Sequence, residues 1–133
     1  MKYLFIILSS ILLLTSCVST TPKLTESSSC WEHQTTEHRG QSDHLTLCFK
    51  SGRVSLEIDH FDSTDETENT ICGQGGRVSN FGDIYYNIDL IDGGCENGRP
   101  IGRSILSCQL ISNNLTCLET LKNYRVKFVR KNA

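Results

Sequence analysis

The stretch Leu45-Thr-Leu-Cys-Phe-Lys-Ser-Gly-Arg-Val-Ser-Leu-Glu-Ile58 decides the fold that we expect for this chain. Apolar residues alternate with other residues on both sides of Ser51-Gly52, which is the period of a half-buried β-strand. A two-residue loop at Ser51-Gly52 would join two strands into a hairpin and set Leu47 opposite Leu56 and Phe49 opposite Val54. In this register Cys48 lies on the other face of the hairpin, so we expect it to reach a partner outside the sheet.

The same alternation recurs in the C-terminal half of the chain. It covers residues 84–90, 106–110, 115–117 and 124–128. A turn at Ser112-Asn113 places Leu110 opposite Leu115, and therefore Cys108 opposite Cys117. Shorter strands are expected at 70–72 and 77–81, on either side of a glycine-rich turn, whereas no stretch has a clear apolar stripe at helical period.

This pattern predicts an all-β domain of seven or eight short strands, either a small antiparallel barrel or a sandwich. A meander joined by hairpin turns favours the barrel. Polar residues 32–43 are expected to be a loop or an irregular wrapping segment. Residues 59–69 are expected to form an acidic loop, and residues 93–100 a turn-rich connection.

The N-terminus has the form of an export signal. Met1-Lys2 is positively charged, and residues 3–14 are almost entirely apolar but too short to span a bilayer. The sequence Leu14-Thr15-Ser16-Cys17 resembles a bacterial lipobox. This resemblance implies cleavage after residue 16, acylation of Cys17, and attachment to the membrane through the N-terminal lipid.

The expected domain organisation follows from this resemblance. Residues 1–16 would be a cleaved lipoprotein signal peptide, residues 17–29 the lipidated cysteine with a flexible tether rich in serine and threonine, and residues 30–133 a single β domain. Val18 is not the aspartate that retains such lipoproteins in the inner membrane of enterobacteria. The resemblance therefore implies the outer membrane of the bacterial cell envelope.

The six cysteines that follow Cys17 form an even set in an oxidising compartment, which indicates three disulfides. The hairpin register predicts Cys108–Cys117. The outward position of Cys48 favours Cys30–Cys48. The remaining pair is Cys72–Cys95.

Catalytic and metal-binding motifs are missing from the sequence. It contains no G-x-S-x-G or H-E-x-x-H motif, and Asp59-His60 near Ser63 is better interpreted as a solvated loop than as part of a triad. His33, His38 and His44 with Cys30 do not have metal-ligand spacing. Residues 62–66 lack the spacing and glycine of a calcium loop. We therefore expect no enzyme activity, no cofactor and no metal.

The charge pattern favours a binding protein. The formal net charge is −2, which argues against nucleic acid as a partner. The acidic loop suits a cationic protein. The candidate partner-binding residues are Asp59, Phe61, Asp62, Asp65, Glu66 and Glu68.

In general appearance the chain is similar to small lipocalin-like and lysozyme-inhibitor-like bacterial lipoproteins. The resemblance to the inhibitors implies a cationic partner such as lysozyme, although Ser51-Gly52 is not followed by the tyrosine of the c-type inhibitor motif. One alternative is a small-ligand carrier whose barrel mouth is lined by Phe81, Tyr85 and Tyr86. Another is a structural or adhesin lipoprotein.

Overall fold

The computed structural model describes residues 23–132. The expected signal peptide, residues 1–16, and Cys17 lie outside the described residues. The elements are β1 (Ser28–Gln34), β2 (Gln41–Lys50), β3 (Arg53–Asp62), the 3-10 turn η1 (Glu66–Glu68), β4 (Thr70–Asn80), β5 (Tyr85–Leu90), β6 (Gly93–Cys95), β7 (Pro100–Ile101), β8 (Ser104–Ile111), β9 (Asn114–Glu119) and β10 (Tyr124–Arg130). Within residues 23–132 there is no helix long and apolar enough to span a bilayer.

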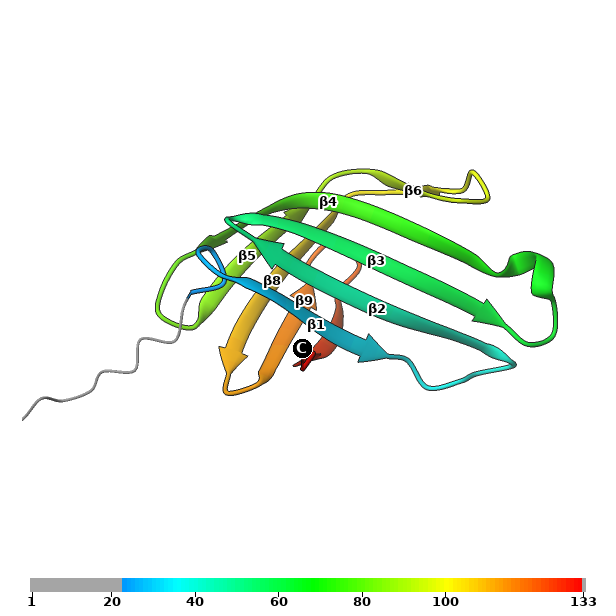
Figure 1. Cartoon of the computed structure of the whole chain (residues 1–133), viewed down its shortest axis with the longest axis horizontal. Helices are drawn as coiled ribbons and strands as arrows, with labels where there is room; N and C mark the ends of the chain where they lie inside the picture. Colours follow the sequence, from blue (N-terminus) through cyan, green and yellow to red (C-terminus); the bar gives the residue numbers. More distant parts are fainter. Residues whose placement is uncertain (1–22, 133) are drawn as a thin grey trace, which may run out of the picture.

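Eight of these strands form a closed antiparallel barrel (Figure 1). Each of β1, β2, β3, β4, β5, β8, β9 and β10 pairs with the next in that order, and β10 returns to pair with β1. Strands β6 and β7 form a small hairpin that attaches to β4 outside this ring. The expected all-β fold is confirmed, and of the two architectures considered the chain adopts the barrel.

The strand registers follow the apolar pattern of the sequence. Leu47 faces Leu56 and Phe49 faces Val54 across the β2–β3 hairpin. Leu110 faces Leu115 and Cys108 faces Cys117 across the β8–β9 hairpin. Because side chains alternate between the two faces of a strand, these registers direct all the apolar members toward the interior.

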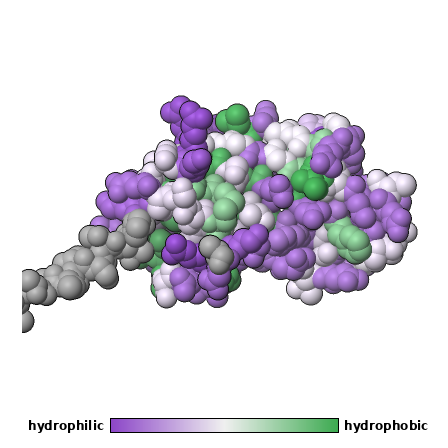
Figure 2. All heavy atoms as spheres, in the orientation of Figure 1, coloured by the Kyte–Doolittle hydropathy of each residue, from purple (hydrophilic) through white to green (hydrophobic). Residues whose placement is uncertain are grey.

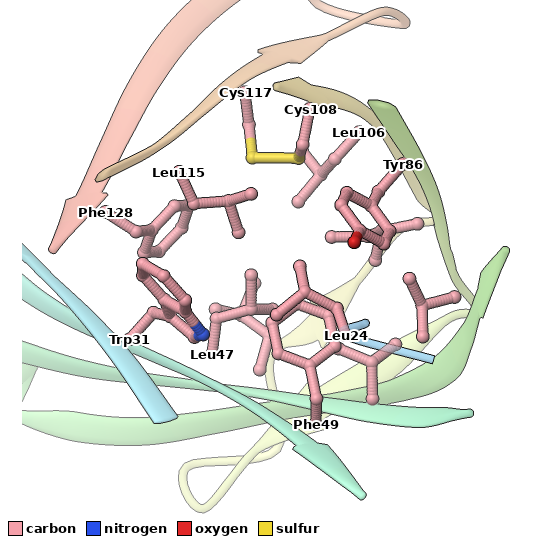
Figure 3. Close-up of a cluster of buried hydrophobic side chains, with 14 of the residues drawn as sticks. Leu24, Trp31, Leu47, Phe49, Tyr86, Leu106, Cys108, Leu115, Cys117 and Phe128 are labelled. Atoms are coloured by element: carbon pink, nitrogen blue, oxygen red, sulfur yellow. A yellow bond between two sulfur atoms is a disulfide. The ribbon is translucent and has the colours of Figure 1, made fainter. Parts of the chain in front are cut away.

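The interior of the barrel is occupied by side chains (Figure 3). The largest side chains that are fully buried include Tyr86, Phe49 and Phe128, and Trp31 packs in the same cluster. Figure 3 shows these residues converging from strands on opposite sides of the barrel. Aromatic side chains of this size bury 150–250 Å² each, by the usual rough estimate, and they fill the space between the barrel walls.

Three disulfides join the pairs that the sequence analysis predicts: Cys30–Cys48, Cys72–Cys95 and Cys108–Cys117. All three link residues that lie directly opposite each other on paired strands. Cys108–Cys117 is buried in the core, while Cys30–Cys48 is only partly buried. Cys72–Cys95 fastens the β6–β7 hairpin to β4.

The folded domain begins earlier than the sequence predicts. Leu24 is only 2% exposed and belongs to the hydrophobic core, and the backbone N–H groups of Glu26 and Ser27 donate to the carbonyl oxygen of Lys23. Strand β1 then begins at Ser28. The boundary at residue 30 was wrong because one buried leucine anchors a segment whose serine and threonine content suggested a tether.

Residues 32–43 are not a continuous loop, as we expected, since β1 extends to Gln34 and β2 begins at Gln41. The segment looks polar because β1 turns a single large apolar residue, Trp31, into the core. Its other residues gain from pairing with β2 on one side and β10 on the other. Backbone hydrogen bonding to two neighbours thus outweighs the weak apolar pattern.

The expected turn around the glycines at 73–76 is also wrong, because β4 runs without a break from Thr70 to Asn80. Gly76 is the residue where this strand begins to pair with β5 as well as β3. A Cβ atom at Gly76 would lie 1.8 Å from the carbonyl oxygen of Asp89. The glycine therefore permits a close approach of two backbones within the sheet.

Glu119 is a buried carboxylate that orders the connection between β9 and β10. It accepts hydrogen bonds from the backbone N–H groups of Ile105, Leu121 and Lys122. Burial alone would raise the pKa of this carboxyl group, but these N–H donors outweigh burial and hold its pKa below the ordinary value. The connection is consequently fixed by one side chain.

Candidate functional site

The acidic segment lies at the end of the barrel where β3 passes into β4, at the right of Figure 1. It is shorter as a loop than the sequence indicated, since β3 continues to Asp62 and β4 begins at Thr70. Phe61 is 50% exposed on the outer face of β3. Asp59, two residues before it on the same face, is exposed, as are Asp65, Glu66 and Glu68 in the loop that follows.

Asp62 is the exception among the six predicted partner-binding residues. It is only 3% exposed, so it is not available to a partner. Its Oδ1 atom accepts from the Thr64 backbone N–H at 2.8 Å and from the Thr64 hydroxyl at 2.6 Å, and its Oδ2 atom accepts from Gln41 at 3.0 Å. Asp62 therefore organises the loop from within, and its assignment as a contact residue is wrong.

The remaining contacts hold the loop in one conformation. Asp65 caps η1 by accepting from the backbone N–H of Thr67 at 3.1 Å. The Ser63 backbone N–H donates to the carbonyl oxygen of Gly40 at 2.8 Å. Gly40 has a φ of 78°, and a Cβ there would come within 2.7 Å of Ser63 and Thr64. The exposed acids and Phe61 are thus presented on a pre-ordered support.

The loop should lose stability as the pH falls through the titration of Asp62. Hydrogen bonds from the Thr64 hydroxyl, the Thr64 backbone and Gln41 lower the pKa of Asp62 from 3.8 to about 2. Because the pKa is lower in the folded state, the contribution to stability is complete above about pH 4 and disappears as the pH falls to about 2. Thermal unfolding of the parent and of Asp62→Asn from neutral pH down to about pH 2 measures the difference. It should be largest at neutral pH and shrink in acid, whereas a constant gap would contradict the role of the carboxylate.

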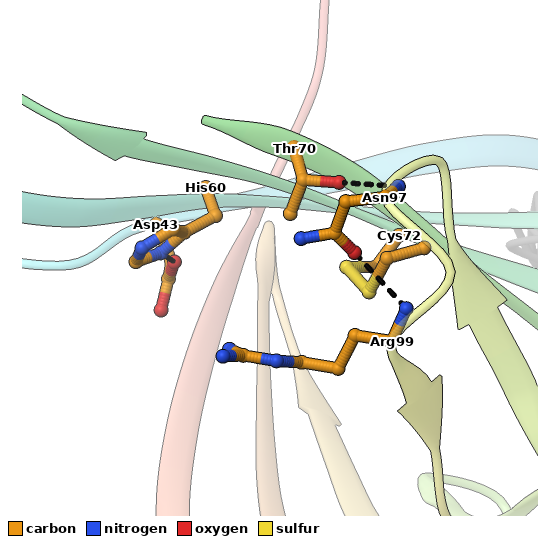
Figure 4. The surroundings of a disulfide bond; sticks show 7 residues. Asp43, His60, Thr70, Cys72, Asn97 and Arg99 are labelled. Carbon is orange, nitrogen blue, oxygen red and sulfur yellow. Dashed lines mark hydrogen bonds and ion pairs between the residues drawn. A yellow bond between two sulfur atoms is a disulfide. The ribbon is translucent and has the colours of Figure 1, made fainter. Parts of the chain in front are cut away.

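His60 points away from Phe61 and toward the barrel interior, where it contacts Asp43. The sequence analysis did not identify this pair. The Nδ1 atom of His60 lies 2.6 Å from Oδ1 of Asp43 on the neighbouring strand β2 (Figure 4). The hairpin register that pairs Leu47 with Leu56 also pairs Asp43 with His60, so the signal was present. The Ser63 hydroxyl instead donates to the Gly40 carbonyl oxygen, and Asp59, His60 and Ser63 do not form a triad.

A second polar group lies close to the Cys72–Cys95 disulfide (Figure 4). The backbone N–H of Asn97 donates to the Thr70 hydroxyl at 3.3 Å, and that of Arg99 donates to the Asn97 side chain at 3.0 Å. These bonds fix the turn of the β6–β7 hairpin against the start of β4. Their partners are backbone groups, so this cluster shapes the hairpin and does not form a set of catalytic side chains.

The histidines considered as metal ligands are separated in the fold. The His33 ring interacts with the carbonyl oxygen of Lys127 at 2.9 Å, whereas His44 lies 3.4 Å from Glu32 on the outer face. Cys30 is in a disulfide. Among residues 23–132, no three histidine, cysteine, aspartate or glutamate residues lie together in a way that could hold a metal ion.

The three aromatic residues predicted to line a ligand-carrying mouth do not share one face. Tyr86 is 1% exposed and packs in the core. Tyr85 is exposed on the outer surface, where it stacks on Phe81 with ring centroids 5.7 Å apart. The predicted mouth is therefore wrong, because adjacent residues of a strand point to opposite sides.

The face of the molecule formed mainly by β1 to β4 is largely hydrophilic, and its apolar spots are small and separate (Figure 2). Such a surface suits recognition by polar contacts around single apolar anchors better than a broad apolar interface.

No protein-family model and no curated protein sequence matches this chain.

Proposed function

We propose that this protein is a lipid-anchored, non-catalytic binding module of the bacterial cell envelope that recognises a cationic protein. The anchor rests on the lipobox-like sequence that ends at Cys17. The recognition surface is formed by the exposed members of the acidic segment: Asp59, Phe61, Asp65, Glu66 and Glu68. A lysozyme is the partner suggested by the similarity to small inhibitor-like lipoproteins.

One observation carries this proposal: Asp62 orders the acidic loop from within, while Phe61 stays half-exposed and the carboxylates of the same segment are exposed. An ordered loop loses little conformational entropy on binding, which favours affinity. An aromatic anchor supplies much of the interface energy, and surrounding charges mainly raise the association rate. The exposed carboxylates of Glu66 and Glu68 are negatively charged, so they attract a basic protein.

A side-chain-filled interior favours this function over a small-ligand carrier. A carrier barrel holds its ligand among the inward-facing residues. In this barrel those positions are taken by Tyr86, Phe49, Phe128 and their neighbours in the core. The three disulfides join paired strands and stiffen the support of the loop. The alternative of a structural or adhesin lipoprotein has no comparable feature in its favour.

Binding to immobilised lysozymes of several classes, measured by surface plasmon resonance on the mature chain with Cys17→Ser, tests the proposal. Phe61→Ala should weaken binding by about 30-fold, mostly through faster dissociation, because it removes the aromatic anchor. Glu66→Gln with Glu68→Gln should slow association at low salt and flatten its salt dependence, because these charges act at long range.

The matched control is Glu26→Gln with Asp83→Asn. It removes the same charge from exposed positions at the opposite end of the barrel. This control should leave both rate constants unchanged. The proposal fails if the parent shows no saturable binding to any cationic protein in the panel, or if the control and the loop variants behave alike.

A further inference from the structure

The two ends of the barrel differ in charge. We define the tether end as the end where the chain enters at Lys23 and β1 starts, together with the β2–β3, β4–β5 and β8–β9 connections and the end of β10 (Figure 1). Among residues 23–132, five cations lie there, against two carboxylates, Glu26 and Asp83. The cations are Lys23, Lys50, Arg53, Arg130 and Lys131. The acidic loop lies at the other end.

From the tether end, the strand register places like charges side by side into the sheet. Lys50 faces Arg53 across the β2–β3 hairpin, and Arg53 faces Arg77 across the β3–β4 pair. Like charges directly opposite each other destabilise a sheet unless an anion lies near them. Within the described residues, none of these three cations has a carboxylate within 4.0 Å. Asp89 on β5 faces Arg77 across the β4–β5 pair, but its carboxylate forms an ion pair with Arg103 at 2.8 Å.

Two of these three cations border a groove at the same end. It has a volume of about 1130 Å³, and its lining includes Lys50, Arg53, Arg130 and Lys131 with the Cys30–Cys48 disulfide between them. The described residues that line the groove include no aspartate or glutamate. Of the four cations, only Lys131 has a carboxylate partner among the described residues, namely Glu32 at 3.2 Å. The groove therefore offers unneutralised positive charge.

Exposed apolar side chains accompany this charge. Phe81 in the β4–β5 connection stacks on Tyr85, the first residue of β5. Ile111 near the end of β8 and Val129 near the end of β10 lie on either side of Asn114, with which both pair. Ile111 is 57% exposed and Val129 is 50% exposed. Aromatic residues beside cations are typical of protein surfaces at the head-group level of a bilayer.

The length of chain between the anchor and the barrel limits where this end can lie. Leu24 is in the core, so only six peptide steps separate Cys17 from Lys23. An extended chain spans at most about 3.6 Å per residue, which gives about 20 Å. Once Cys17 carries a lipid, the tether end must stay within about that distance of the membrane surface.

We propose that the tether end docks on the head-group phosphates of the anionic bilayer that holds the lipid anchor, with Lys50, Arg53 and Arg130 in contact with phosphate. The docked barrel then points the acidic loop away from the membrane. This inference rests on the anchor in the proposed function, but it does not depend on the identity of the protein partner.

Vesicle binding tests this proposal without the lipid. The full mature chain with Cys17→Ser should bind vesicles that contain phosphatidylglycerol and not vesicles of phosphatidylcholine alone. Lys50→Gln with Arg53→Gln should lower the partition coefficient by about 30-fold, since each basic residue near an anionic surface contributes about 1 kcal/mol. Lys122→Gln with Arg125→Gln removes the same charge near the β9–β10 connection and should have no effect. Equal loss in the two double variants, or equal binding to both kinds of vesicle, would overturn the proposal.

A second measurement uses the native lipoprotein in phosphatidylglycerol vesicles. An amine-acylating reagent should modify Lys122 freely and Lys50 slowly, and detergent should remove the difference. Equal reactivity in the vesicles rejects the docked orientation. Palmitate labelling in cells, with Cys17→Ser as the control, tests the anchor separately. If the parent is not labelled, or if Cys17→Ser is labelled equally, the lipid anchor is rejected. The vesicle-binding result then decides whether the tether end binds anionic lipid by itself.

Discussion

Reduction of the three disulfides is expected to unfold the barrel at physiological temperature. Each bond closes a loop between cysteines that are 9, 18 or 23 residues apart. Loops of this length contribute about 3 kcal/mol per bond, so all three contribute about 9 kcal/mol. Domains of this size have a total stability of about 5–15 kcal/mol. Circular dichroism during heating, with and without a reducing agent, measures the loss.

The stability that each disulfide contributes should depend more on the burial of its sulfur atoms than on the length of the loop it closes. Doubling a loop adds only about 0.6 kcal/mol of entropy, which favours Cys30–Cys48 slightly over Cys108–Cys117. Each buried sulfur that is removed from the core costs about 1 kcal/mol in lost packing. Replacing Cys108 and Cys117 with alanine should therefore destabilise the barrel more than replacing Cys30 and Cys48. The opposite order would show that loop entropy dominates.

Gly76→Ala is expected to be the most damaging single-methyl change in the sheet. The added Cβ would lie 1.8 Å from the Asp89 carbonyl oxygen and 3.0 Å from the Leu90 Cα atom. Both obstacles are backbone, so no side-chain rotation relieves the overlap. Overpacking typically costs about 1–3 kcal/mol, and a forced separation of β4 from β5 should reach or exceed the upper value.

The neighbouring Gly75 is the matched control. A Cβ there would meet only the Val54 carbonyl oxygen, at 3.9 Å, which is ordinary van der Waals contact. Gly75→Ala should therefore be close to neutral in urea denaturation, while Gly76→Ala should lower the midpoint strongly. Equal midpoints for the two variants would show that the sheet at Gly76 is looser than the backbone distances imply.

The part of the fold that the sequence predicted is the part fixed by local pairing. The hairpins at Ser51-Gly52 and Ser112-Asn113 each bring apolar residues into register over a two-residue turn, so adjacent residues contain the whole signal. The same registers led to Cys108–Cys117 and placed Cys48 on the outer face, which favoured Cys30–Cys48, whereas Cys72–Cys95 was simply the remaining pair. They also contained the Asp43–His60 pair, which was overlooked because the alternation was followed only as far as the apolar residues.

The rest of the fold depends on contacts between distant residues, which a local pattern cannot show. Strand β1 is ordered by β10, and Leu24 by a core that the whole barrel encloses. Asp62 resembled its acidic neighbours in sequence, but its hydrogen bonds with Thr64 and Gln41 give it a structural role. The close approach at Gly76 depends on β5, which follows later in the chain.

The pairing of the first strand with the last also has a consequence for the order of synthesis and export. Trp31 pairs with Arg130, and the backbone N–H of Lys131 donates to the Cys30 carbonyl oxygen. A chain that is exported N-terminus first therefore keeps two open strand edges until β10 has crossed the membrane. Trp31 is the only tryptophan and lies at this seam beside Phe128 (Figure 3), so its fluorescence should report the moment of closure.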